Sequence, residues 1–186
     1  MLPAASPILS LLRHATQPYH AALEQNEFNR QLLAGTVSAA ATEHFLGKLY
    51  TFLRPYEAAL DQQFFSADWE IEARHRAHLI AQDLPGVGAL PDCPRMPPLR
   101  TRAQVLGAMY VLEGSTLGGQ LISRQLAKAG STLRTYFTGY GEQTGSRWKR
   151  FCLLLAAEAE EEPPQAEIVG SAILTFQHLH AWIEQP

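Results

Sequence analysis

The chain has 186 residues, of which 46% are hydrophobic and 18% charged, and its formal net charge is −3 at pH 7. This length suits one domain with a hydrophobic core and is short for two. The slightly acidic balance argues against general electrostatic binding to nucleic acid or to an anionic membrane. No apolar run approaches the roughly 20 residues that span a bilayer, and the first residues lack the basic and apolar regions of a signal peptide. We therefore expect one cytoplasmic domain over residues 1–186.

Neither the cysteines nor the paired histidines form a convincing metal site. Cys93 lies in a proline-rich stretch and Cys152 in a helical pattern, so we expect two free thiols rather than a disulfide or a metal centre. His75 and His78 have a spacing that suits a metal, but arginines flank them.

The first half of the chain predicts helices and no strands, because Ala, Leu, Glu and Gln dominate and alternating β-branched runs are absent. Proline after Ser6 opens a helix to about Gln25, and Pro18 is expected to bend it. A short helix over 28–33 ends at Gly35, and Ser38 caps a helix to about Phe65. A further helix is expected from Asp68 to about Asp83. Seven prolines and glycines then predict a loop over 84–99.

The second half predicts one long helix and three shorter ones. Thr101 caps the long helix, which reaches about Ala129 and stops at Gly130. A short element over 133–137 and a turn at Gly139 and Gly141 follow. The last helices cover about 145–161 and 164–183, separated by Pro163 and Pro164. The expected fold is thus an all-α, single-domain bundle of about seven to eight helices.

Glycines in the long helix need an explanation. Gly114, Gly118 and Gly119 lie within six positions, and each costs about 1 kcal/mol relative to alanine inside a helix. Two interpretations remain open: close approach of another helix backbone, or of a flat ligand. A phosphate loop is excluded, because there is no preceding strand and no Gly-Lys-Ser/Thr ending.

Polar residues of the first helix share one stripe. Arg13, Thr16, His20 and Glu24 are spaced i, i+3, i+7 and i+11, which places them on one face. A carboxylate four residues after a histidine can accept the Nδ1 proton and leave Nε2 free to bind a metal. A histidine on an amphipathic helix is more often a packing residue, so the stripe alone does not decide between the two.

Three separated motifs together resemble the haem oxygenase family. Arg13, His20 and Glu24 look like its proximal helix. The segment from Tyr110 to Gln120, with Glu113-Gly114-Ser115 and Leu117-Gly118-Gly119, looks like its glycine-bearing distal helix. The segment from Tyr136 to Phe151, with Arg147 and Arg150, is similar to a third family segment. The resemblance covers about residues 8–183, in the family's order.

The resemblance implies a haem-binding site between the first helix and the long, glycine-kinked helix. It implies that His20 binds the haem iron, that Glu24 supports its ring, and that Arg13, Tyr110, Arg147 and Arg150 contribute to haem binding. Lys149 is a weaker candidate of the same kind. Gly114, Ser115, Gly118 and Gly119 would form the catalytic face on which dioxygen binds.

Two residues depart from the family pattern. Ser115 stands where the animal enzymes have an aspartate that organises water for proton delivery. The motif with serine looks like a bacterial variant found in enzymes encoded beside bacteriophytochromes. Met109 stands where a propionate-binding tyrosine is found. A serine hydroxyl can still donate to and accept from water.

The resemblance implies oxidative cleavage of haem by dioxygen to biliverdin, carbon monoxide and ferrous iron. Haem would be both cofactor and substrate. Electrons would come from an external ferredoxin, flavodoxin or reductase, because the sequence has no flavin or nicotinamide motif, and a bacteriophytochrome is a further expected partner that accepts biliverdin. The competing hypotheses are a catalytically silent haem carrier or sensor on the same fold, and a helical enzyme that binds another ring or amine.

Overall fold

All the regular secondary structure is helical in the part that the structure, a computed structural model, describes: residues 6–161 and 165–185. The eight α-helices are α1 (Pro7–Glu24), α2 (Glu27–Ala34), α3 (Ala39–Asp61), α4 (Ala77–Asp83), α5 (Arg102–Lys128), α6 (Thr135–Thr138), α7 (Thr144–Glu161) and α8 (Gln165–Ile183). Short 3-10 helices lie at Ala67–Trp69, Ile71–Arg74, Val87–Ala89 and Gly141–Gln143. The all-helical prediction is confirmed, while the prediction of one domain over residues 1–186 stays a prediction. Pro163 and Pro164, predicted to separate the last two helices, lie outside the described residues.

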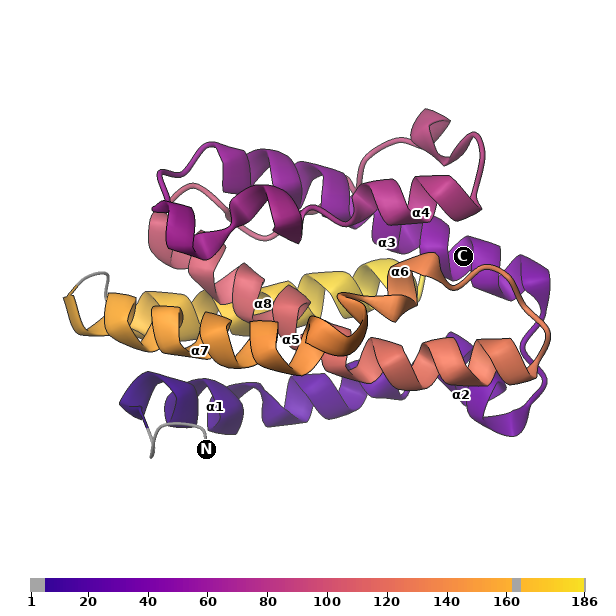
Figure 1. The fold of residues 1–186 in the computed structure, drawn as a ribbon, viewed down its shortest axis with the longest axis horizontal. Coiled ribbons are helices and arrows are strands. Elements are labelled where there is room, and N and C mark those ends of the chain that lie inside the picture. Colours follow the sequence, from indigo (N-terminus) through magenta and orange to yellow (C-terminus); the bar gives the residue numbers. More distant parts are fainter. Residues whose placement is uncertain (1–5, 162–164, 186) are drawn as a thin grey trace.

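The long helix α5 lies at the centre of the bundle and packs mainly on α8, with α6 and α7 also against it. Helix α1 packs on α8 and α7, and Figure 1 shows these three elongated helices lying along one another, with α3 and α4 on the other side of the molecule. Gly107 allows the close α5–α8 packing, because a Cβ there would clash with the Ile168 carbonyl and lie 2.7 Å from Ser171 Cβ. Among the described residues, no helix is long and apolar enough to cross a membrane.

The capping residues set several helix ends as expected. The Ser38 side chain accepts from the Ala41 amide at the start of α3. Thr101 and Gln104 form a reciprocal capping box at the start of α5, which satisfies two amides that have no partner in the helix. Gly35 ends α2 with a φ of 70°. Helix α1 continues through Pro18 to Glu24, so the proline does not end it.

The predicted helix over 68–83 is wrong in its first half. Residues 67–74 form two 3-10 turns, and only Ala77–Asp83 is α-helical. Glu70 joins the turns with a φ of +48°, and the buried Arg74 side chain donates to the Trp69 carbonyl. Tertiary contacts of Trp69 and Arg74 thus override the local helix propensity.

Candidate functional site

His20 and Glu24 lie one turn apart on the exposed side of α1. His20 Nδ1 is 3.4 Å from Glu24 Oε2, and the two side chains are 56% and 66% exposed. The edge of the imidazole meets the Phe176 ring of α8, with ring centroids 5.7 Å apart. With Nδ1 directed at a carboxylate, Nε2 is the nitrogen left to bind a ligand.

Tyr110 of α5 lies beside the first half of α1. Its hydroxyl neighbours Thr16 and Arg13; burial and Cys152 raise its pKa, and Thr16 and Arg13 act in the opposite direction. Arg13 itself is exposed. The structure therefore brings together Arg13 and Tyr110, two of the predicted binding residues.

The level of His20 along α5 follows from this contact. Helices α1 and α5 run in the same direction in Figure 1, and both rise about 1.5 Å per residue. If Thr16 is level with Tyr110, then His20, four residues further on, is level with Gly114. Glu24 is correspondingly level with Gly118.

The glycines of α5 divide into two kinds. A Cβ on Gly119 would lie 3.0 Å from the Phe137 carbonyl oxygen, so this glycine permits packing of α6. A Cβ on Gly118 would meet nothing within 4 Å, and one on Gly114 would meet only the edge of Trp148, at 3.5 Å. The packing interpretation thus applies to Gly119, which was predicted to belong to the catalytic face, whereas the flat-ligand interpretation stays a prediction for Gly114 and Gly118.

Exposed apolar side chains surround the open glycine. Leu117 and Leu121 are 44% and 50% exposed, and with Gly114 and Gly118 they follow the i, i+3, i+4, i+7 spacing of one helix face. An apolar helix face of this kind ordinarily packs against something. Together with an exposed imidazole on α1 and the Arg13 cation, it fits a flat, largely apolar ring that carries a metal and acidic groups. Those are the properties of haem.

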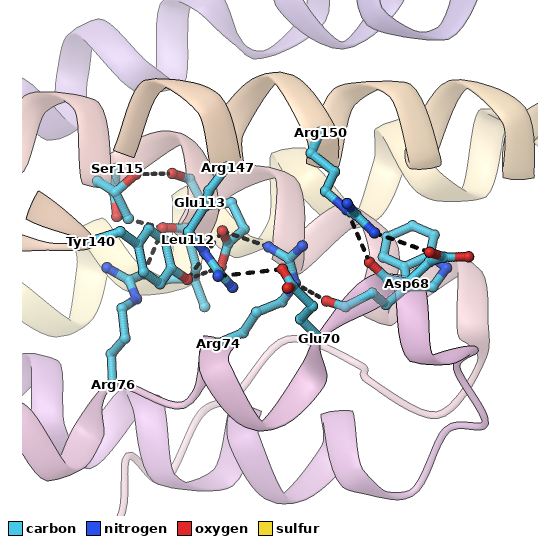
Figure 2. Close-up of polar contacts among 12 residues, drawn as sticks. Asp68, Glu70, Arg74, Arg76, Leu112, Glu113, Ser115, Tyr140, Arg147 and Arg150 are labelled. Atoms are coloured by element: carbon cyan, nitrogen blue, oxygen red, sulfur yellow. Dashed lines mark hydrogen bonds and ion pairs between the residues drawn. The ribbon is translucent and has the colours of Figure 1, made fainter. Parts of the chain in front are cut away.

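A buried polar cluster lies behind this face of α5, and the sequence did not predict it. Arg74 Nη1 is 2.7 Å from Glu113 Oε2, with side chains only 1% and 2% exposed. The Tyr140 hydroxyl donates to Glu113 at 2.9 Å. Arg76 Nη2 donates to the Leu112 carbonyl at 2.7 Å, as Figure 2 shows. One signal was available: Glu113 is a single carboxylate after an apolar stretch, four residues beyond the buried Met109.

Burial shapes the protonation of this cluster. Burial and the adjacent Glu113 raise the pKa of Tyr140 to about 12. The pKa of Tyr56, whose hydroxyl is buried with no hydrogen-bond partner, is also raised well above its usual value, chiefly by burial. Both phenols therefore stay neutral and act as dipoles around the buried charges.

Arg147 and Arg150 do not join Arg13 and His20. Arg147 Nη1 is 3.3 Å from Glu70 Oε2, and Arg150 Nη2 is 3.0 Å from Asp68 Oδ1, so Figure 2 shows both directed at the 67–74 segment. Trp148 is the residue of α7 that faces Gly114 of α5. Because a helix turns about 100° per residue, Arg147 and Arg150 point away from that side of α7. In this structure both guanidinium groups pair with acidic side chains of the protein, and their contribution to haem binding stays a prediction.

Other predicted features have simple outcomes. Cys93 and Cys152 are free thiols, as expected. Ser115 is exposed on α5, and its hydroxyl donates to the Leu112 carbonyl at 2.7 Å. Lys149 is exposed on α7. Within the described ranges, no group of three or more metal-binding side chains is present, and His75 Nε2 instead lies 3.0 Å from Asp61.

Comparisons with known proteins agree on one family. Residues 6–90, which include α1, match the haem oxygenase family model. A curated haem oxygenase from Xanthomonas campestris pv. campestris (strain 8004) is 26% identical over 151 residues, covering 78% of this chain and 90% of the relative. That match extends beyond the residues the family model covers.

Two solved structures share the fold at 15% sequence identity. The haem oxygenase from Leptospira interrogans has a TM-score of 0.76 and covers 95% of this chain and 98% of its own. Haem oxygenase-1 from the cyanobacterium Synechocystis sp. PCC6803, solved in complex with haem, has a TM-score of 0.70 and covers 95% and 90%. The partial family match, the curated relative and the two solved structures thus all make this chain similar to haem oxygenases, and the solved structures share its fold.

Proposed function

We propose that this protein is a haem oxygenase, which cleaves haem with dioxygen and external electrons to biliverdin, carbon monoxide and ferrous iron. One inference from the geometry carries the proposal: because Tyr110 of α5 lies beside Thr16, the His20–Glu24 pair further along α1 falls level with the open glycine face of α5. Each side supplies what the other lacks, a nitrogen ligand on α1 and an unobstructed surface on α5. The match of residues 6–90 to the haem oxygenase family model and the name of the curated relative support the same activity.

His20 would hold the haem iron, and Glu24 would hold the ring of His20. The carboxylate accepts from Nδ1, fixes the tautomer and leaves Nε2 for iron. The present separation of 3.4 Å is long for a hydrogen bond, and we expect it to shorten when iron withdraws charge from the ring.

Arg13 pairs with a haem propionate. It is exposed and lies near Tyr110 and Cys152. A guanidinium binds a carboxylate through two parallel hydrogen bonds. This contact would fix the rotation of the haem and hence which meso carbon is attacked. Tyr110, beside Arg13, would contact the same end of the haem.

The α5 face receives the other side of the ring. Gly118 and Gly114 present backbone without side chains, and Leu117 and Leu121 offer apolar contact. Bound ferrous haem supplies the dioxygen chemistry. Ser115, the polar side chain beside these glycines, would supply or relay a proton through its hydroxyl.

The partners follow from the reaction. Because the sequence has no flavin or nicotinamide motif, electrons come from an external ferredoxin, flavodoxin or reductase. A bacteriophytochrome that accepts biliverdin is the proposed recipient of the product, and the cytoplasm is the proposed compartment.

A second candidate is a catalytically silent haem carrier or sensor. One observation favours it: the Ser115 hydroxyl donates its proton to the Leu112 carbonyl, so the proton points at the helix rather than at the open face. A haem carrier would need His20 and Arg13 but no proton donor.

The decisive experiment is a titration with hemin followed by visible spectroscopy, repeated with a reductant in air. A stoichiometric Soret band that depends on His20 and converts to a biliverdin spectrum would establish the enzyme. A Soret band that persists under reductant would establish the carrier. Absence of a specific band would refute both.

A further inference from the structure

The Leu112 carbonyl accepts hydrogen bonds from two side chains. Ser115 Oγ donates to it at 2.7 Å and Arg76 Nη2 donates to it at 2.7 Å. Leu112 lies inside α5, where the ordinary partner of its carbonyl is the amide of Thr116. A carbonyl oxygen has two lone pairs, so three donors compete for two acceptor positions.

Arg76 is anchored so that its guanidinium reaches this carbonyl. The side chain is 3% exposed, and its backbone amide and that of Ala77 donate to Glu57 Oε1 at 2.6 and 2.9 Å. Its guanidinium carbon lies 5.2 Å from the centre of the Tyr136 ring and 5.9 Å from that of Tyr140. Arg76 thus reaches Leu112 from the segment before α4, on the opposite side from α1.

Arg76 stays protonated despite its burial. Burial alone would lower the pKa of Arg76, but Tyr136, Glu113, Tyr140 and Tyr56 raise it above its usual value. The carboxylate of Glu113 is paired with Arg74 rather than with Arg76. The charge of Arg76 is therefore directed at a neutral acceptor, the Leu112 carbonyl.

Strength decides which donor Leu112 keeps. A hydrogen bond from a charged donor is roughly twice as strong as one between neutral groups, and an exposed hydroxyl rotates freely between acceptors. When Ser115 turns away, Leu112 remains satisfied by Arg76, so the rotation leaves no unpaired buried acceptor. Without Arg76, the Thr116 amide and the Ser115 hydroxyl would each have one lone pair of the carbonyl, so the same rotation would forfeit a hydrogen bond.

We propose that Arg76 is a positioning residue that holds the Leu112 carbonyl and thereby releases the Ser115 hydroxyl to donate toward the open face of α5. This inference builds on the proposed haem oxygenase function and explains how a serine at this position donates a proton. Arg76 does not touch the haem. It acts through one backbone carbonyl.

The test uses carbon monoxide as a probe of the haem-loaded, reduced protein. A hydrogen bond donated toward the probe, or a positive charge near it, lowers the infrared C–O stretching frequency. The variants are Ser115→Ala, Arg76→Met and the double variant. A fourth, Arg147→Met, is the matched control, because Arg147 is a mostly buried cation of the same cluster that stacks on Tyr140 and has no bond to Leu112.

The expected result is strong coupling between Arg76 and Ser115. Ser115→Ala raises the C–O frequency, and Arg76→Met raises it by most of the same amount. In the Ser115→Ala background, Arg76→Met then adds only a small shift, comparable to that of Arg147→Met. Equal shifts of Arg76→Met in both backgrounds would show a charge effect alone and overturn the proposal, as would no shift at all.

Two precautions keep the test decisive. If Arg76→Met fails to reach the helix content of the parent by circular dichroism, Arg76→Lys replaces it, because it keeps the charge and loses the planar fork. A raised frequency in Arg76→Lys supports the proposal, and the parent frequency overturns it. Failure of hemin to give a Soret band would refute the proposed function, whereas normal turnover without coupling would refute only the role of Arg76.

Discussion

At the scale of single residues, exposure separates the proposed ligand-binding side chains from those that hold the fold. His20, Glu24 and Arg13 are exposed, so their removal leaves no cavity in the core. Glu113 and Arg74 are almost completely buried, and their loss leaves a charge without its partner. Substitutions at the two groups should therefore affect different measurements.

His20→Ala should abolish the His-dependent Soret band and haem turnover, and it should change the melting temperature little. The reason is that Nε2 is the proposed iron ligand while the ring makes one edge contact, with Phe176. Hemin titration and thermal unfolding check both parts. His14→Ala, another exposed histidine of α1, is the matched control, and biliverdin formation at the normal rate in His20→Ala would sink the ligand assignment.

Glu113→Gln should lower the free energy of unfolding by about 3–5 kcal/mol, the usual cost of removing one partner of a buried ion pair. The loss leaves Arg74 without its carboxylate and weakens the acceptor of the Tyr140 hydroxyl. Urea unfolding measures the change. Asp68→Asn, which breaks the exposed pair with Arg150, should stay within about 1 kcal/mol of the parent; similar losses in both variants would contradict the role of burial.

At the scale of elements, α5 combines two uses of glycine. Its first half approaches α8 through Gly107, and its second half approaches α6 through Gly119. Between them, a Cβ on Gly118 would meet nothing within 4 Å and one on Gly114 would meet only the edge of Trp148. The conformational cost of glycine in α5 thus accompanies close packing at two positions and an open surface at the other two.

Gly107→Ala and Gly118→Ala should change stability in opposite directions. The methyl at position 107 would clash with the α8 backbone and should cost about 1–3 kcal/mol. The methyl at position 118 meets nothing, and the apoprotein should gain up to about 1 kcal/mol from helix propensity while hemin affinity falls. Chemical unfolding of both apoproteins and a hemin titration of the second check this, and unchanged affinity in Gly118→Ala would mean that this face does not hold the ring.

At the scale of the whole molecule, alkaline pH should destabilise the fold. Burial raises the pKa of Cys152 to about 11, with Arg13 opposing it, and that of Tyr140 to about 12. Both groups ionise at lower pH in the unfolded chain. The stability they contribute is complete below their unfolded pKa values and is lost as pH rises through the folded ones.

Cys152→Ala should therefore show a shallower loss of stability between about pH 9 and 11 than the parent protein. The parent should lose on the order of 2 kcal/mol more over this interval, because the thiol ionises first in the unfolded state. Urea unfolding at several pH values measures both slopes. Parallel slopes would mean that the thiol titrates normally in the fold.

Local patterns determined the helices, several of their caps and the residues of α1. Ser38, Thr101 and Gly35 act through neighbours a few positions away, so their roles follow from the sequence. The i, i+4 geometry of His20 and Glu24 is likewise a property of one helix. The three motifs in order also indicated the family without any tertiary contact.

Only the tertiary structure decided what lies behind α5 and which glycines are open. Arg74 and Arg76 lie in the segment before α4, whereas Glu113 lies on α5. The ion pair of Arg74 with Glu113 therefore depends on how the 67–76 region folds, where sequence propensity wrongly favoured a helix. Arg147 and Arg150 likewise found acidic partners in that region, 77 and 82 positions earlier in the chain. The physical reason is the same in each case: short-range propensity fixes the helix, whereas the partner of a side chain depends on the packing of distant segments.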